Sequence, residues 1–270
     1  MLVSAPERIR PWVSQLWVSH GAQAPRRAVE HVLPTGQMHL VFRLGGPALR
    51  ILHDGHDIMP RTIEGPVLGG ARSRFYAKAA DPSVISIGAV LRPGASLALF
   101  RVSAAELAER HTPLADLVGA DANTLHAQLA QAPNERQQLD LLCQWLTTRS
   151  SNASPVTPLV RHALAGLAWP GGVDALVRAS HYSHRGFLAQ FKQAAGLGPK
   201  RLARLMRFQR LLQALRSPLL SSLSDIALDQ GFSDQAHMNR EFRVMAGVTP
   251  QHYRRLAPCN SHHVSLGATW

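Results

Sequence analysis

The chain has 270 residues, which fits one large or two ordinary domains and is ample for a sizeable hydrophobic core. Its formal charge of +12 and isoelectric point near 11.2 favour a polyanionic partner. No stretch approaches the roughly 18 consecutive apolar residues of a membrane span, and the first residues lack the apolar run of a signal peptide. We therefore expect no membrane partner and a cytoplasmic location.

Short apolar or alternating runs fill the first part of the chain. They are separated by turn residues such as Gly45, Gly46 and Pro47, and each has the length of a strand. We therefore expect a β-rich N-terminal domain. Its expected strands are Trp12–Val18, Val29–Leu33, Met38–Leu44, Leu49–Leu52, Pro66–Gly69 and Val84–Leu91.

A helical pattern follows Pro93 and Gly94. Ser103 and Glu106 have the spacing of a capping box, which predicts a helix start. A longer helix is expected over Glu135–Arg149. Its apolar side consists of Leu139, Leu142, Trp145 and Leu146.

The composition changes at residues 151–158, where serine and proline accumulate as they do in linkers. We expect residues 1–150 to form the β-rich sensory or dimerisation domain, with a helical C-terminal part. Residues 159–256 are expected to form a second, all-α domain. The last residues, 257–270, are expected to be a disordered tail.

The six histidines from His20 to His111 raise the question of a metal site. A site on a strand needs ligands at alternate positions, because alternate residues share a face. His53 and His56 are three residues apart across a predicted turn, so we expect surface or hydrogen-bonded histidines, no metal and no cofactor. Cys143 and Cys259 imply no disulfide framework, and Cys143 is expected in the core. The six histidines are His20, His31, His39, His53, His56 and His111.

A helix-turn-helix is predicted in the segment LSDIALDQGFSDQAHMNREFRVMAGVTPQHY. Ser224 is expected to cap its first helix, and Ser233 its second. Gly231 is expected to form the turn, because glycine adopts a positive φ without strain. Met238 and Phe242 lie four residues apart and are expected to face inward.

A second copy of this pattern lies upstream, over Val173–Pro199. Ser183 is again expected to cap a helix, on which Phe187 and Phe191 lie four residues apart. The capping position recurs 50 residues later, so the two units are repeats. Lys200–Leu215 carries apolar residues at a helical period, which predicts one long helix joining the units.

Basic residues are concentrated around the repeats. Residues 171–256 contain 13 Lys/Arg and 5 Asp/Glu, whereas residues 1–170 contain 16 and 12. A surface that faces DNA requires such a local excess of positive charge.

The second unit contains IAxxxGFS starting at Ile226, RxF starting at Arg240 and GxTPxxYR starting at Gly247. With these motifs and two units joined by a long helix, the chain resembles the AraC family (AraC/XylS type) of bacterial transcription regulators. The resemblance implies a nucleoid-associated regulator, not an enzyme, that binds double-stranded DNA sequence-specifically and contacts RNA polymerase. It also implies an α+β fold whose β-rich, cupin-like domain senses a small-molecule effector or pairs protomers into a homodimer.

Two other functions stay open at this point. A cupin-like, metal-dependent enzyme domain tethered to a DNA-binding module would carry bound iron, zinc or manganese. A non-specific nucleic-acid-compacting protein would bind every duplex with equal affinity.

Base-reading residues are expected on the outward face of the first two turns of the second helix of each unit, because this part enters the major groove. In the second unit these are Gln235, His237, Asn239 and Arg240, and the resemblance places base or phosphate contacts at these positions. Ala236 is expected to touch a thymine methyl group.

The first unit departs from the family pattern. Leu188 and Ala189 stand where the family usually carries polar residues. We therefore expect this unit to read few bases, with Arg185 in the groove and His184 and Lys192 on phosphates.

Overall fold

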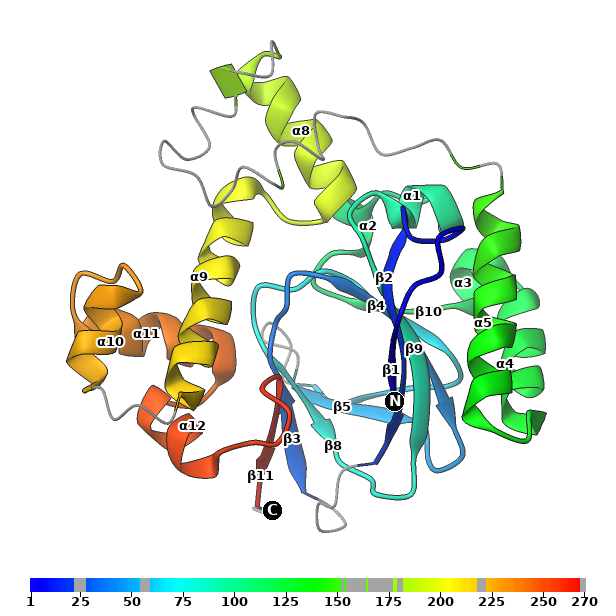
Figure 1. The fold of residues 1–270 in the computed structure, drawn as a ribbon, viewed down its shortest axis with the longest axis horizontal. Helices are drawn as coiled ribbons and strands as arrows, with labels where there is room; N and C mark the ends of the chain where they lie inside the picture. Colours follow the sequence, from blue (N-terminus) through cyan, green and yellow to red (C-terminus); the bar gives the residue numbers. More distant parts are fainter. Residues whose placement is uncertain are drawn as a thin grey trace.

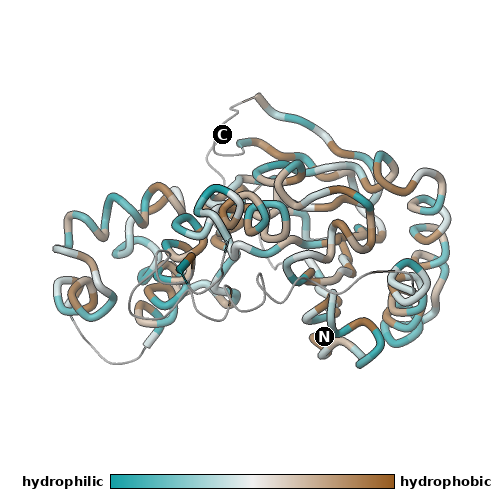
Figure 2. Tube along the Cα trace, turned by 90° about the horizontal axis from the view of Figure 1, so that it is seen from above, coloured by the Kyte–Doolittle hydropathy of each residue, from teal (hydrophilic) through white to brown (hydrophobic). Residues whose placement is uncertain are grey.

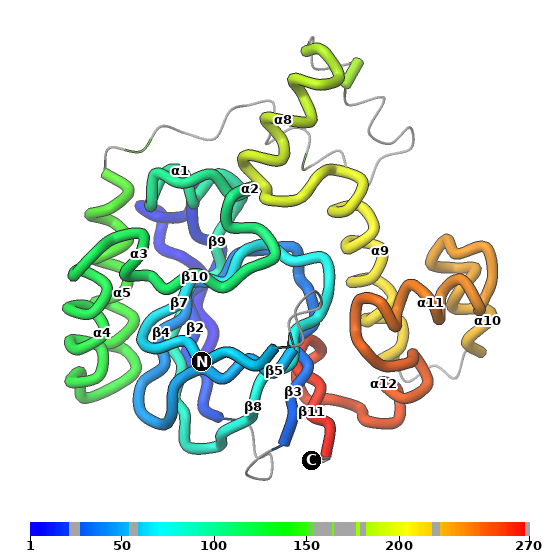
Figure 3. The backbone as a smooth tube through the Cα atoms, turned by 180° about the vertical axis from the view of Figure 1, so that it is seen from behind, coloured from blue at the N-terminus to red at the C-terminus, as the bar shows by residue number. Residues whose placement is uncertain are grey.

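The computed structural model describes residues 1–21, 28–53, 59–151, 153, 164, 177–178, 182–217 and 222–267. Two antiparallel sheets form the N-terminal domain, and helices cover one of them (Figure 1). Seen from both sides, the C-terminal helices lie along the flank of this domain that is opposite α4 and α5 (Figures 1 and 3). The β-rich N-terminal domain followed by a helical module is therefore confirmed.

The first sheet has six strands in the order β1-β2-β9-β4-β7-β10, and the second has five in the order β11-β3-β8-β5-β6. The six strands expected from the sequence are confirmed within a few residues. Each of the five others has only three or four residues, too few to produce a clear alternating pattern. The strands are β1 (Leu2–Ser4), β2 (Val13–His20), β3 (Val29–Val32), β4 (Met38–Leu44), β5 (Leu49–His53), β6 (Arg61–Ile63), β7 (Val67–Gly69), β8 (Tyr76–Ala79), β9 (Ile85–Leu91), β10 (His111–Pro113) and β11 (His263–Leu266).

The main core lies between the first sheet and the helices that follow it. Along β4 buried and half-buried residues alternate, and Leu40 and Phe42 on its buried face are completely inaccessible. The predicted capping box of Ser103 and Glu106 is confirmed at the start of α2. Trp145 on α5 is only half-buried, with Arg149 over its ring. The helices are α1 (Ala95–Phe100), α2 (Ala104–Leu107), α3 (Ala115–Val118), α4 (Asp121–Gln131) and α5 (Glu135–Ser150).

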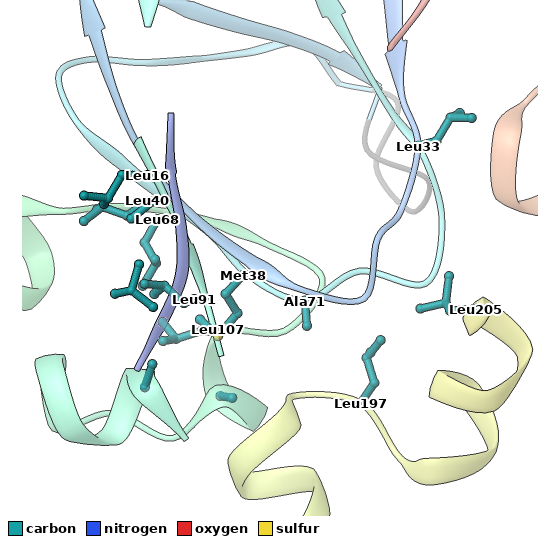
Figure 4. Close-up of a cluster of buried hydrophobic side chains, with 14 of the residues drawn as sticks. Leu16, Leu33, Met38, Leu40, Leu68, Ala71, Leu91, Leu107, Leu197 and Leu205 are labelled. Atoms are coloured by element: carbon teal, nitrogen blue, oxygen red, sulfur yellow. The ribbon is translucent and has the colours of Figure 1, made fainter. Parts of the chain in front are cut away.

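The helical module shares its core with the N-terminal domain. Leu197 and Leu205 of the module belong to the same buried cluster as Leu33 and Ala71 (Figure 4). Hydrophobic and hydrophilic residues alternate along the helices, as in amphipathic helices packed on one side (Figure 2). None of the described helices is long and apolar enough to cross a bilayer. The module consists of α8 (His184–Ala195), α9 (Pro199–Arg216), α10 (Leu223–Asp229), α11 (Gln235–Ala246) and α12 (Pro250–Leu256).

The expectation of a disordered tail over residues 257–270 is wrong. β11 in this tail pairs antiparallel with β3, and Val264 is completely buried. The strand forms because the edge of β3 offers unpaired backbone groups, which a four-residue segment can satisfy. His263 also bonds the buried carboxylate of Glu30. The end of the chain thus adds a strand to the N-terminal domain.

Two expectations fall mainly on residues outside the described ranges. The linker over residues 151–158 has only residues 151 and 153 described, and the first helix of the upstream unit has only residues 177–178. The long joining helix is confirmed as α9.

Candidate nucleic-acid interface

The first helix of the downstream unit, α10, is capped by Ser222. The Ser222 hydroxyl accepts a hydrogen bond from the backbone N–H of Asp225 at 3.1 Å and donates one to its carboxylate at 2.7 Å. The prediction that Ser224 caps this helix is therefore wrong, because Ser222 and Asp225 have the capping-box spacing. Gly231 has a φ of +76° and turns the chain toward α11, as predicted.

The second helix, α11, is capped by Asp234 rather than by the predicted Ser233. The Asp234 carboxylate accepts the backbone N–H of His237 at 2.6 Å, and this bond lowers the pKa of Asp234. A carboxylate is favoured here because the N-terminus of a helix carries partial positive charge. The Ser233 hydroxyl is hydrogen-bonded to Nδ1 of His237 at 3.0 Å instead.

One side of α11 is buried, and the opposite side is open to solvent. Met238 and Phe242 are fully inaccessible, as predicted. Ala236, Arg240 and Arg243 are exposed, and their spacing of four and three residues places them on one face. Arg243 was not among the predicted DNA contacts, although its position one turn after Arg240 could have indicated it.

Three of the predicted contact residues on α11 have internal neighbours. The carboxamide oxygen of Gln235 accepts a hydrogen bond from the Ser224 hydroxyl at 2.8 Å. The half-buried His237 ring packs edge-on against Phe232, with 5.5 Å between ring centroids. Asn239 is half-buried, and its Oδ1 is buried without a partner among the described residues. Of the five predicted residues, Ala236 and Arg240 are therefore the two that are exposed.

The joining helix α9 is ion-paired with α11. Arg204 forms a bidentate pair with Glu241, with N···O distances of 2.6 and 3.0 Å. Arg207 lies 3.7 Å from the same carboxylate, donates to the Gly231 carbonyl and covers the Phe232 ring. These two arginines therefore fix the position of the turn and of α11.

The upstream unit presents a shorter charged face. The Ser183 hydroxyl accepts the Gly186 N–H at 3.1 Å, so the predicted cap of α8 is confirmed. Phe187 and Phe191 are buried and stacked, with 6.1 Å between centroids. The exposed residues of α8 include His184, Arg185, Ala189 and Lys192, whereas Leu188 is half-buried.

Both candidate recognition helices end on the N-terminal domain. Near the end of α8, the Ala194 carbonyl accepts a hydrogen bond from the Gly94 N–H at 2.7 Å. Near the end of α11, the Met245 carbonyl accepts one from the Phe75 N–H at 3.0 Å. Carbonyls in the last turn of a helix lack partners within the helix, so these bonds satisfy them and connect both helices to the β-rich domain.

The histidines of the N-terminal domain occupy different environments. Burial lowers the pKa of His39 to about 4, and its ring is hydrogen-bonded to Thr35. His20 pairs with Glu135 at the surface, and His56 lies outside the described residues. In the described part of the chain, no three His, Cys, Asp or Glu side chains are grouped as a metal site requires. Both cysteines are free, and Cys143 is half-buried.

Comparison with known proteins gives two family matches. Residues 176–256 match a family described as a helix-turn-helix domain. Residues 3–113 match a domain of unknown function, DUF6597.

Two relatives named HTH-type transcriptional activator RhaR share sequence with the chain. The one from Pectobacterium carotovorum subsp. carotovorum is 28% identical and the one from Pectobacterium atrosepticum 27% identical, each over 105 residues. This segment is 39% of the present chain and 37% of each relative, so the chain spans well under half of the relatives' length.

Among solved structures, ToxT from Vibrio cholerae superimposes with a TM-score of 0.47 at 9% identity, over 91% of this chain and 99% of ToxT. The family resemblance of the helical module rests on the helix-turn-helix match over residues 176–256 and on the IAxxxGFS and GxTPxxYR motifs within it. Residues 176–256 are therefore a helix-turn-helix domain, and this match supports the resemblance of the chain to the AraC family of transcription regulators.

Proposed function

We propose that the protein is a ligand-responsive regulator of transcription that binds double-stranded DNA sequence-specifically. The observation that carries the proposal is the exposed face of Ala236, Arg240 and Arg243 on α11. This helix is capped by Asp234, and the Arg204–Glu241 ion pair fixes it to α9. Its exposed face is therefore preorganised to enter a groove of DNA.

In this proposal α11 enters the major groove. Arg240 pairs with guanine and Ala236 contacts a thymine methyl group, while Arg243 neutralises phosphate. Gln235, His237 and Asn239 contact bases only after exchanging their internal contacts for DNA. On α8, Arg185 enters the neighbouring groove, and His184 and Lys192 hold phosphates.

The partners follow from this arrangement. A bound small-molecule effector would act through the β-rich domain, because both candidate recognition helices are hydrogen-bonded to it. RNA polymerase is the proposed partner in activation or repression, and a second copy of the chain would supply a further pair of recognition helices. We propose no catalytic activity.

Fluorescence anisotropy on the DNA upstream of the coding sequence and on a scrambled duplex, at several salt concentrations, tests the proposal. We expect binding to the first duplex that is about 10³-fold tighter or more near physiological salt. Equal binding to both, with a steep salt slope, would mean phosphate contact alone and would support a non-specific compacting protein.

A further inference from the structure

A hollow of about 150 Å³ lies where α9, α11 and the loop before β8 meet. Small-molecule sites usually have roughly 300–1,000 Å³ and mostly apolar walls. This hollow is smaller, and three arginines line it, so it suits one charged group rather than a whole organic molecule. Its lining consists of Ser73 and Arg74 from the loop, Arg201 and Arg204 from α9, and Val244 and Met245 from α11.

The loop of the N-terminal domain is fixed against the end of α11. The Phe75 N–H donates to the Met245 carbonyl at 3.0 Å. The His31 ring stacks on Phe75 with 4.3 Å between centroids and is hydrogen-bonded to the next carbonyl of α11 at 3.0 Å. Gly247 has no room for a side chain, since a Cβ there would lie 2.5 Å from the Phe75 ring. Arg74, the residue before Phe75, is therefore held beside α11.

The hollow borders the face of α11 that is proposed to enter DNA. Val244 is exposed and lies four residues after Arg240, so both are on the same side of the helix. The major groove is about 12 Å wide, and an α-helix with its side chains is about 10–12 Å across. A helix in the groove therefore fills it, and groups beside the helix meet the phosphates at the groove edge. The hollow lies in this position, because α9 and α11 are side by side (Figures 1 and 3).

The start of α9 carries exposed positive charge that helix stability does not explain. Lys200 and Arg201 are exposed in its first turn, which contains no acidic residue. Positive charge is unfavourable there, because the N-terminus of a helix carries partial positive charge itself. Among the described residues, no carboxylate is paired with Arg201.

Carboxylates beside the hollow already bond its lining residues. Glu109 accepts hydrogen bonds from the N–H and the hydroxyl of Ser73, and Glu241 pairs with Arg204. A guanidinium has five N–H donors, so an arginine that keeps a contact within the protein can also donate to a phosphate. The positive charge offered to a ligand therefore depends mainly on Arg201, and the geometry of its binding on all three arginines.

We propose that this hollow holds a backbone phosphate of DNA at the edge of the major groove that α11 enters. The inference rests on the proposed function, which places α11 in that groove. It goes further in one respect, because Arg74 belongs to the N-terminal domain, and this domain then contacts DNA directly. Phosphate contacts fix the register and orientation of a protein on the duplex without reading bases. A change in the β-rich domain would thus reach a DNA contact through Arg74.

Fluorescence anisotropy of the full-length protein over a salt series tests the inference, on the upstream duplex and on the scrambled one. Arg74→Gln and Arg201→Gln should each reduce the slope of log K against log salt concentration by about 1, because one phosphate contact is lost. Each variant should weaken binding to both duplexes by a similar factor, since the phosphates are the same in every sequence.

Two further variants serve as controls. Arg74→Lys keeps the positive charge and should keep the salt slope, whereas a purely structural role of the guanidinium would not be rescued in this way. Arg50→Gln removes an exposed arginine from β5 and should leave the slope unchanged. Arg74 and Arg201 are exposed, so their replacement is expected to leave the fold intact, which urea unfolding checks.

Unchanged salt slopes in both Arg74→Gln and Arg201→Gln would overturn the inference. An effect of Arg201→Gln alone would confine the contact to α9 and refute the contribution of the N-terminal domain. Weaker binding to the upstream duplex only would indicate a base contact instead of a phosphate.

The unmodified protein separates this inference from the proposed function. Equal affinity for both duplexes would refute sequence-specific binding, while reduced slopes in the two variants would leave the phosphate site standing. Specific binding with unchanged slopes would refute the phosphate site alone. A protein that bound neither duplex would refute both.

Discussion

The two candidate recognition helices, α8 and α11, end in the same way but present different surfaces. Each offers a last-turn carbonyl to a backbone N–H of the N-terminal domain. α11 exposes two arginines on one face and is held by ion pairs from α9, whereas α8 exposes His184 and Arg185 near its start. From this difference we propose that α11 supplies sequence preference and that α8 mainly supplies anchoring.

The largest expected effect concerns the buried phenylalanine on each helix. Phe242 packs between Phe208 and Tyr253, whereas Phe187 stacks on Phe191 in a small separate cluster. Phe242→Ala should lower the free energy of unfolding by about 3–5 kcal/mol, and Phe187→Ala by an amount at the lower end of that range. Urea unfolding measures both, and an equal or larger loss for Phe187→Ala would contradict the proposed difference in support.

The next effect concerns the residues that are proposed to contact bases. Arg240→Ala should cost about 1–3 kcal/mol of specific binding and relax the preference at one base pair. Arg185→Ala should cost less than Arg240→Ala, because α8 is expected to read few bases. Anisotropy titrations on specific and scrambled duplexes measure this, with the distant Arg50→Ala as control. If Arg185→Ala changed neither affinity nor sequence preference, α8 would have to be regarded as a scaffold.

A pH effect probes how the downstream unit is attached to the N-terminal domain. His262 bonds Gln209 of α9 at 2.6 Å, and Gln209 donates to the Pro34 carbonyl. Burial lowers the pKa of His262 from 6.5 to about 4, so the unfolded chain binds more protons between these values. Stability should therefore fall as the pH drops through this window, with a contribution of at most about 1.4 kcal/mol per pH unit from this group.

His262→Gln should flatten that dependence, and the exposed His184→Gln should not. Thermal or urea unfolding between pH 7 and pH 4 measures both slopes. Identical slopes in His262→Gln and the unmodified protein would show that this contact does not report on the attachment.

The smallest effect concerns the ion pair between α9 and Glu241 of α11. Glu241→Gln removes the carboxylate that Arg204 and Arg207 share, and Arg204 is about half exposed. The free energy of unfolding should fall by only about 0.2–1 kcal/mol. Asp229→Asn on α10 removes the same charge without a described ion pair. A loss of equal size in both variants would mean that net charge, not the pair, accounts for the effect.

The sequence allowed the helices of the module to be located because their signals are local. The cap at Ser183, the turn at Gly231 and the Thr249–Pro250 start of α12 each depend on a few neighbouring residues. Two caps, Ser224 and Ser233, were placed wrongly, because several adjacent side chains could serve and only the geometry selects among them.

The candidate site was less predictable than the fold. Gln235, His237, Asn239 and Arg240 on α11 were all expected to contact DNA, but whether a side chain is free depends on contacts that sequence spacing does not show. Gln235 is hydrogen-bonded to a helix 11 residues earlier in the chain, and Asn239 is half-buried. Arg243 was overlooked although it shares the exposed face.

By itself the sequence determined the family motifs, the two-part organisation and the concentration of positive charge around the repeats. Only the tertiary structure decided that β11 pairs with β3, more than 200 residues away, and that the Lys78 ammonium lies 3.6 Å from the buried Glu30 carboxylate. The physical reason is the separation along the chain between the interacting residues. Caps, turns and helical periods are set by neighbours along the chain, whereas strand pairing and buried charge clusters depend on which distant segments come together.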